Sequence, residues 1–174
     1  MEILIIVVLV VVGILFLSTA KNPDKEQTPT RTVSSASVTS RNFKIAGISR
    51  RCSKRDIGII MGAVVNDKNN PHDPYAKAVI ANYGQSDERL LGYIAKTDQY
   101  NYERLAQNAT ELPFVGFIEE FEADDNRMAI FGKIKVFSGN STAVENAMSE
   151  NMKYIANAFS IKNYEDRMKM LDTL

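Results

Sequence analysis

The chain has 174 residues, and its 21 Lys and Arg side chains are balanced by 21 Asp and Glu side chains, so the net charge at pH 7 is zero. The balance also holds over residues 42–137 and excludes a uniformly basic protein that binds nucleic acid through its overall charge. Any such binding is expected to be local and sensitive to salt. The single cysteine, Cys52, excludes an internal disulfide framework.

The chain opens with an apolar segment. Residues 3–17 carry no charge, and the tolerated residues 18–20 extend the segment to about the 20 residues that a spanning helix needs. We therefore expect residues 1–20 to form one transmembrane anchor, in contact with the lipid bilayer through residues 3–20. The alternative is a signal peptide cleaved near residues 18–20, although residues 1–2 contain no Lys or Arg.

The charges beside the apolar segment predict its orientation. Lys21, Lys25 and Arg31 follow it, whereas only Glu2 precedes it. The positive-inside rule then places the C-terminal domain in the cytoplasm. If the segment is a cleaved signal, the domain is exported instead.

Residues 21–41 have the composition of a linker. They are rich in Ser, Thr, Pro and charged residues and have almost no large apolar side chains. Such a segment cannot bury enough surface to offset the entropy lost on ordering. We expect a flexible tether here, with a folded domain beginning at residue 42.

Residues 42–137 have the pattern of a small β-barrel. Along residues 130–137, the set Ile130, Gly132, Ile134 and Val136 alternates with the set Phe131, Lys133, Lys135 and Phe137, which is typical of a strand. The mostly polar residues 122–126 separate this segment from an earlier apolar segment. A short helix is expected at residues 97–108. The predicted fold class is therefore mainly β (α+β), with six strands in one barrel. The strands are predicted at residues 43–49, 58–66, 76–83, 90–95, 112–121 and 127–137.

In residues 138–174 the apolar residues recur every three or four positions instead of every second position, which predicts a helical extension. Thr142 and Glu145 have the spacing of a capping box at a helix start, and a second short helix is expected from Asn163. An apolar stripe on the first helix favours packing against the barrel, with a protein partner on this helix as the alternative. The stripe consists of Val144, Met148, Met152, Ile155 and Phe159.

Three segments in order resemble a known family. They read Lys44-Ile-Ala-Gly-Ile-Ser49, Asn69-Asn-Pro-His-Asp-Pro-Tyr-Ala-Lys-Ala-Val79 and Leu91-Gly-Tyr-Ile-Ala-Lys96. They are similar to the Val-x-Gly, Asn-Pro-Tyr-Asp-x-Asn-Ala-Ile-x-Val and Val-Gly-Tyr-Ile-Pro-Arg segments of the HIRAN domain. HIRAN domains occur at the front of DNA-repair helicases of the SWI/SNF type and alone in many bacterial proteins. The resemblance covers about residues 42–137 and implies a Greek-key barrel related to OB and SH3 barrels.

The resemblance also implies binding of single-stranded DNA, with the 3′ end of the strand held in a pocket. Carried over by position, the central segment contributes Asn69, Asn70 and Asp73 to this site. Asp73 would accept a hydrogen bond from a free 3′ hydroxyl and would repel a 3′ phosphate. Tyr93 would stack on a base or donate a hydrogen bond, and Lys96 would bind a phosphate.

The chain departs from the family at two places. Where the helicase members have two adjacent aromatic residues, this chain has Arg50 and Arg51, and His72 replaces the tyrosine of the central segment. Stacking on that aromatic pair is therefore lost. Arginine itself stacks on bases and binds phosphate, so both arginines are candidate nucleic-acid-binding residues.

No combination of residues predicts catalysis. One histidine and one cysteine without a CxxC partner do not predict a zinc site, and the sequence has no Walker lysine motif. We therefore expect a non-catalytic, membrane-tethered module that binds single-stranded DNA without a metal or cofactor. The alternative is a protein-interaction or scaffold module at the membrane that has lost DNA binding.

Overall fold

The structure, a computed structural model, describes residues 37–123 and 127–174. The predicted anchor at residues 1–20 and most of the predicted linker lie outside the described residues. Within the described ranges, no helix is both long enough and apolar enough to cross a membrane.

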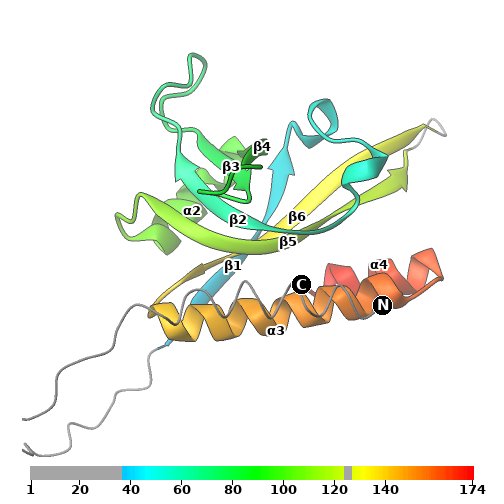
Figure 1. Ribbon diagram of the computed structural model, residues 1–174. Helices are drawn as coiled ribbons and strands as arrows, with labels where there is room; N and C mark the ends of the chain where they lie inside the picture. The colour runs from blue at the N-terminus through cyan, green and yellow to red at the C-terminus, as the bar shows by residue number, and fades with distance from the viewer. Residues whose placement is uncertain (1–36, 124–126) are drawn as a thin grey trace, which may run out of the picture. The chain divides into compact units, whose positions relative to one another are not determined.

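Six antiparallel strands close into a barrel, which confirms the six-stranded, mainly β prediction (Figure 1). Around the barrel the order is β1-β4-β3-β2-β5-β6, so β1 pairs with both β4 and β6. The β1–β4 and β2–β5 pairs join strands that are not consecutive in the chain. The strands are β1 (Thr39–Ala46), β2 (Gly58–Asn66), β3 (Lys77–Ala81), β4 (Arg89–Ile94), β5 (Glu111–Glu122) and β6 (Met128–Ser138).

The first strand differs from the prediction at both ends. It begins earlier, at Thr39, because the backbone from Thr39 to Lys44 pairs with β6 although most of these side chains are exposed. It ends earlier, at Ala46, because Gly47 adopts a left-handed conformation with a φ of 75°. Gly47 turns the chain into the 3-10 helix η1 (Ile48–Arg50). The barrel therefore includes the last residues of the segment expected to be a linker.

The interior of the barrel is one apolar core. Phe114, Ile134 and Val136 of β5 and β6 are fully buried in it. The predicted short helix is α2 (Gln99–Ala106), whose Tyr102 packs in the same core and donates a hydrogen bond to the carbonyl oxygen of Val64, 3.0 Å away. Burial raises the pKa of the Tyr102 phenol, so the hydroxyl remains a neutral donor. Removal of this apolar surface from water is the main stabilising term of such a domain.

Two helices cover the outer face of β5 and β6 (Figure 1). The helices α3 (Ser141–Ser160) and α4 (Tyr164–Asp172) share a second apolar cluster with Val115, Phe117 and Phe137, which point away from the barrel interior. The stripe predicted on the first helix belongs to this cluster, so its packing against the barrel is confirmed.

The start of α3 differs from the prediction. The side-chain oxygen of Asn140 accepts hydrogen bonds from the backbone N–H groups of Thr142 and Ala143, at 3.1 and 3.4 Å. Asn140 is therefore the N-cap, and the predicted capping box of Thr142 and Glu145 is wrong, because Asn140 already satisfies the free N–H groups. Asn163 caps α4 in the same way, where the second helix was predicted to begin.

A buried ion pair joins α4 to β5. Nε of Arg167 lies 2.8 Å from Oε2 of Glu119, whose side chain is only 2% exposed. Arg167 also donates a hydrogen bond to the carbonyl oxygen of Ile161, and its guanidinium lies over the rings of Phe159 and Tyr164. A buried carboxylate is tolerated only when it is paired, so β5 depends on α4 for this partner.

We predict that Arg167→Leu lowers the free energy of unfolding by about 3 kcal/mol, because Glu119 is left buried without its cation. Chemical denaturation of the full-length protein in non-ionic detergent, followed by tyrosine fluorescence, measures the change. The matched control is Lys169→Leu, since the ion pair of Lys169 with Asp166 is 3.8 Å long and exposed. Equal stability of the two variants would contradict the role given to Arg167.

Candidate functional site

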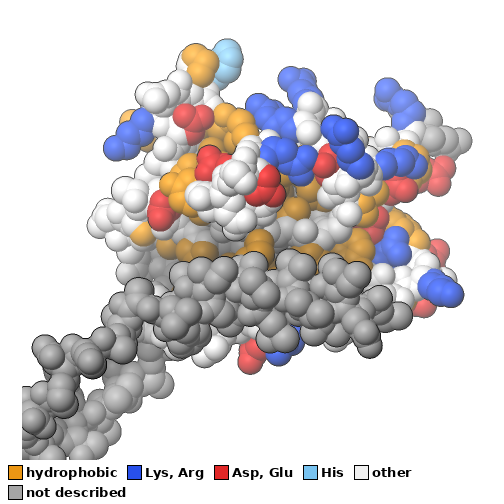
Figure 2. Space-filling model, in the orientation of Figure 1, with side chains coloured by type: hydrophobic (Ala, Val, Ile, Leu, Met, Phe, Trp, Pro, Cys, Tyr) orange, Lys and Arg blue, Asp and Glu red, His pale blue; other side chains and the backbone are white. Residues whose placement is uncertain are grey.

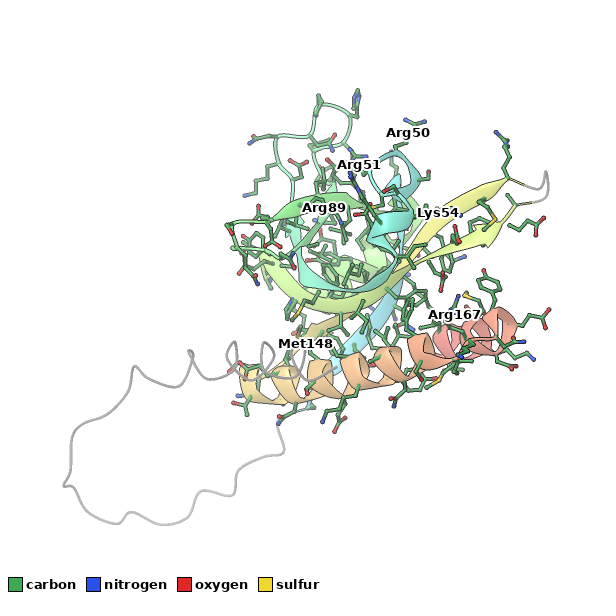
Figure 3. All side chains as sticks on the ribbon, turned by 45° about the vertical axis from the view of Figure 1, so that its right-hand side comes forward. Arg50, Arg51, Lys54, Arg89, Met148 and Arg167 are labelled. Atoms are coloured by element: carbon green, nitrogen blue, oxygen red, sulfur yellow. The ribbon has the colours of Figure 1, made fainter. Side chains whose placement is uncertain are left out.

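Two consecutive loops, one on each side of β2 in the sequence, lie on the side of the barrel away from α3. The basic loop, residues 47–57, joins β1 to β2, and the polar loop, residues 67–76, joins β2 to β3. Figure 3 shows Arg50 and Arg51 on the basic loop at the same end of the barrel as the polar loop, with Arg89 of β4 below them. The cations of the basic loop are Arg50, Arg51, Lys54 and Arg55.

The basic loop is attached to the barrel by apolar and ionic contacts. Ile48 and Cys52 are buried in the core, and burial raises the pKa of the Cys52 thiol. Oδ1 of Asp56 lies 2.6 Å from Nη1 of Arg89, and Oδ2 of Asp56 accepts a hydrogen bond from the backbone N–H of Ser53 at 2.7 Å. The backbone of the loop is thus held in place, while its arginine side chains remain exposed.

Tyr93 of β4 connects the two loops. The guanidinium carbon of Arg51 lies 5.6 Å from the centre of the Tyr93 ring, which is a cation–π contact. The hydroxyl of Tyr93 donates a hydrogen bond to Oδ2 of Asp67 in the polar loop, at 3.1 Å. Burial, and then the hydrogen bond with Asp67, raises the pKa of the Tyr93 phenol. The structure therefore brings two of the predicted site residues, Arg51 and Tyr93, into direct contact.

Asn70 and Asp73 determine the shape of the polar loop. Oδ1 of Asn70 accepts hydrogen bonds from the backbone N–H groups of His72 and Asp73, at 3.0 and 3.2 Å. Asp73 accepts from the backbone N–H of Tyr75 at 2.9 Å and, through its other oxygen, from Nε2 of Gln99 at 2.8 Å. The hydrogen bond from Gln99, followed by that from Tyr75, lowers the pKa of Asp73. Both predicted residues therefore stabilise the loop, as Asn and Asp often do in turns.

The other three predicted residues are exposed around this pair of loops. Lys96 begins the 3-10 helix η3 (Lys96–Asp98), and its charge contributes to the lowered pKa of Asp73. Asn69 lies on the polar loop and Arg50 on the basic loop, both with exposed side chains. Figure 2 shows Lys and Arg side chains over this side of the barrel, with Asp and Glu side chains among them. The basic loop itself carries four cations against one carboxylate, that of Asp56, although the chain as a whole is neutral.

Sequence reasoning missed three residues that the structure adds to the site. Asp67 accepts a hydrogen bond from the hydroxyl of Tyr93. Gln99 donates a hydrogen bond to Asp73, although Gln99 lies outside the segments that predicted the site. Tyr75 lies inside the central segment but was not assigned a role, and its ring is 72% exposed. Only Tyr75 carried a sequence signal, because it is an aromatic residue that directly follows a proline in the turn before β3.

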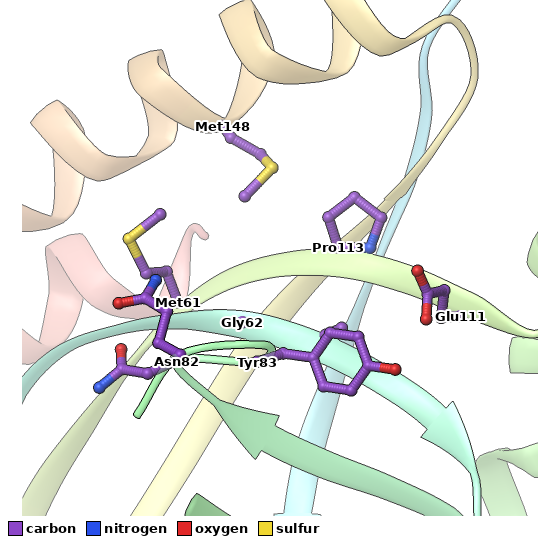
Figure 4. Close-up of a pocket in the computed structure, with 9 residues that line it drawn as sticks. Met61, Gly62, Asn82, Tyr83, Glu111, Pro113 and Met148 are labelled. Carbon is purple, nitrogen blue, oxygen red and sulfur yellow. The ribbon is translucent and has the colours of Figure 1, made fainter. Parts of the chain in front are cut away.

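A separate pocket of about 340 Å³ lies between β2 and α3 (Figure 4). Met61 of β2 and Met148 of α3 line opposite sides of it, and Tyr83 and Glu111 lie at its edge. The lining includes none of the seven predicted site residues. In the ranges that the structure describes, no group of three His, Cys, Asp or Glu side chains is placed to hold a metal ion.

Comparisons of the chain with protein-family models, with curated proteins and with solved structures find no match. Function must therefore be inferred from the residues themselves and their geometry.

We predict that Arg89→Gln raises the pKa of Asp56, which the hydrogen bond with Arg89 holds at about 2. Because this pKa lies below the unfolded value of about 3.9, Asp56 contributes stability above that value and loses it as the pH falls toward 2. Removing Arg89 should therefore shrink the loss of stability between about pH 4 and pH 2.

Carbon-13 NMR titration of the Asp56 carboxyl in the full-length protein measures the pKa directly. Arg55→Gln is the matched control, since Arg55 is an exposed cation beside Asp56 in the chain and is not a cause of the lowered pKa. An unchanged titration of Asp56 in Arg89→Gln would refute the assignment.

Proposed function

We propose that the chain is a HIRAN-like, non-catalytic module that binds single-stranded DNA, with a preference for free 3′ ends, on the surface formed by the basic and polar loops. The observation that carries the proposal is the contact between Arg51 and Tyr93, because it joins two candidate residues from separate segments. A guanidinium stacked on a tyrosine ring offers a planar surface to a base and a positive charge to a phosphate.

Exposed cations on the two segments that follow β1 and β4 are suited to the DNA backbone. Arg50 and Arg55 are exposed on the basic loop, and Lys96 is exposed where β4 leads into η3. Few phosphates can be neutralised by so few cations, so the affinity should fall with salt less steeply than that of a strongly basic protein.

Asp73 and Asn70 support a preference for a 3′ hydroxyl over a 3′ phosphate. Each oxygen of Asp73 accepts one internal hydrogen bond and has a second lone pair for another donor. A hydroxyl can donate to that position, whereas a phosphate is repelled by the ionised carboxylate. The side chain of Asn70 also forms a hydrogen bond with Tyr93, so it connects Asp73 to the Arg51–Tyr93 contact.

The proposal includes the membrane tether. Residues 1–20 would span the bilayer once, and residues 21–38 would link them to the domain. The flanking charges favour placing that domain in the cytoplasm. The strand order, with β1 beside β4 and β5 beside β2, supports a Greek-key barrel of the OB or SH3 type. A scaffold role through α3 has less support, because the apolar stripe of that helix is already packed against the barrel.

We expect the full-length protein in non-ionic detergent to bind single-stranded DNA ending in a 3′ hydroxyl more tightly than DNA ending in a 3′ phosphate or a blunt duplex. Fluorescence anisotropy with labelled oligonucleotides at low and moderate salt measures the three affinities. Equal binding of all three would limit the site to general attraction by the basic loop. Absence of binding at low salt would refute the proposal.

A second prediction concerns Arg51. Arg51→Gln should weaken binding and reduce the slope of log affinity against log salt by about 0.7, the value for one lost phosphate contact on a single strand. Tyr93→Ala should weaken binding by about 1–3 kcal/mol with little change in that slope, because it removes stacking and no charge. Lys153→Gln on the exposed face of α3 is the control for general charge. If Lys153→Gln reduces the affinity for DNA as much as Arg51→Gln does, the result would argue against a local site.

A further inference from the structure

Tyr75 and Tyr100 are the most exposed large apolar side chains among the described residues, at 72% and 71%. The other exposed side chains of this kind lie between 38% for Phe121 and 51% for Met128. One exposed aromatic ring on a protein surface is ordinary. Two rings exposed to this degree on neighbouring segments are not explained by packing.

A hydrogen-bonded carboxylate joins the segments that carry the two tyrosines. Nε2 of Gln99 donates to one oxygen of Asp73, at 2.8 Å, and the backbone N–H of Tyr75 donates to the other, at 2.9 Å. Tyr100 follows Gln99 as the second residue of α2. Asp73 therefore holds the backbone of the polar loop against the start of α2.

The contacts of α2 explain why Tyr100 stays in solvent. Tyr102 faces the barrel core, and Glu103 forms an ion pair with the buried Lys77 of β3. With 3.6 residues per turn, Tyr100 and Arg104 form a row on the side of the helix opposite Tyr102. Tyr100 thus lies outside the core, and the adjacent face of α2 is bound to the segment that follows Tyr75.

Positive charge accompanies the two rings. The guanidinium carbon of Arg104 lies 6.0 Å from the centre of the Tyr100 ring, and Lys96 lies near Asp73. Of the acidic groups on these segments, Asp73 and Glu103 are each bonded to a neighbouring side chain, and Asp98 is the N-cap of α2. Aromatic rings interspersed with cations are the usual means of holding single strands without reading their sequence.

We propose that Tyr75 and Tyr100 form a second stacking surface, which receives the bases at the 3′ end of the strand beside Asp73, whereas Arg51 and Tyr93 receive bases farther from that end. This inference rests on the proposed function and extends it, because it gives the bound strand a path from the basic loop across the polar loop to α2. It also provides aromatic stacking in a chain where Arg50 and Arg51 replace the expected aromatic pair.

The test compares short and long oligothymidylates on the full-length protein in non-ionic detergent. A strand of about three nucleotides covers only the end site at Asp73 and the two tyrosines, whereas one of about twelve also reaches Arg51 and Tyr93. Tyr75→Ala and Tyr100→Ala should each weaken binding of both strands about fivefold or more. Tyr75→Phe and Tyr100→Phe keep the ring and should bind both strands as the wild type does.

Two further readings separate stacking from a structural effect. The chain has no tryptophan, so tyrosine fluorescence reports stacking directly. The long strand should quench this fluorescence in the wild type and quench it less in the double Phe variant, although that variant binds equally well. Gln99→Ala, which keeps both rings but removes their link through Asp73, should weaken binding of both strands.

The outcomes distinguish this inference from the proposed function. If the wild type binds neither strand, both are overturned. If the wild type binds both strands and the Ala variants bind the long one as tightly, only the second stacking surface is overturned. Tyr83→Ala is the control, because Tyr83 is 40% exposed and lines the separate pocket near α3, so its loss should change neither affinity.

Discussion

The burial of β5 on both faces is the constraint on which the rest of the structure depends. Phe114 and Ile118 fill the barrel interior, whereas Val115 and Phe117 point to the other side, and all four are completely buried. An antiparallel barrel strand usually leaves its outer face to water. Here the outer face must be covered, which makes α3 and α4 part of the same folded unit as the barrel and commits that side of the domain to packing.

The side away from α3 is consequently the one where loops can serve a ligand. The base of the basic loop is anchored to the barrel, because Ile48 and Cys52 are part of the core and Asp56 is paired with Arg89. The polar loop is held by its own side chains and by α2. Exposed side chains on loops that are rigidly attached to a scaffold are a common arrangement for binding sites.

Local patterns predicted the six strands and the helical stripe, because burial repeats every second residue in a strand and every three or four in a helix. They missed the start of β1 at Thr39, whose pairing with β6 is made by the backbone and leaves no side-chain pattern. The site was predicted only in part for a related reason. Asp67 and Gln99 act through partners 26 residues away, so their roles exist only once the barrel has closed.

The balanced charge of the chain gives the Arg51–Tyr93 contact its importance. Charges on exposed side chains act over about 10 Å at moderate salt, so a neutral chain attracts a polyanion only where its cations are locally unopposed. A guanidinium keeps its charge while it stacks, so Arg51 combines in one position what a tyrosine pair and a lysine would otherwise supply separately. In the proposed function, electrostatic attraction and base stacking would therefore occur at the same place, where Arg51 contacts Tyr93.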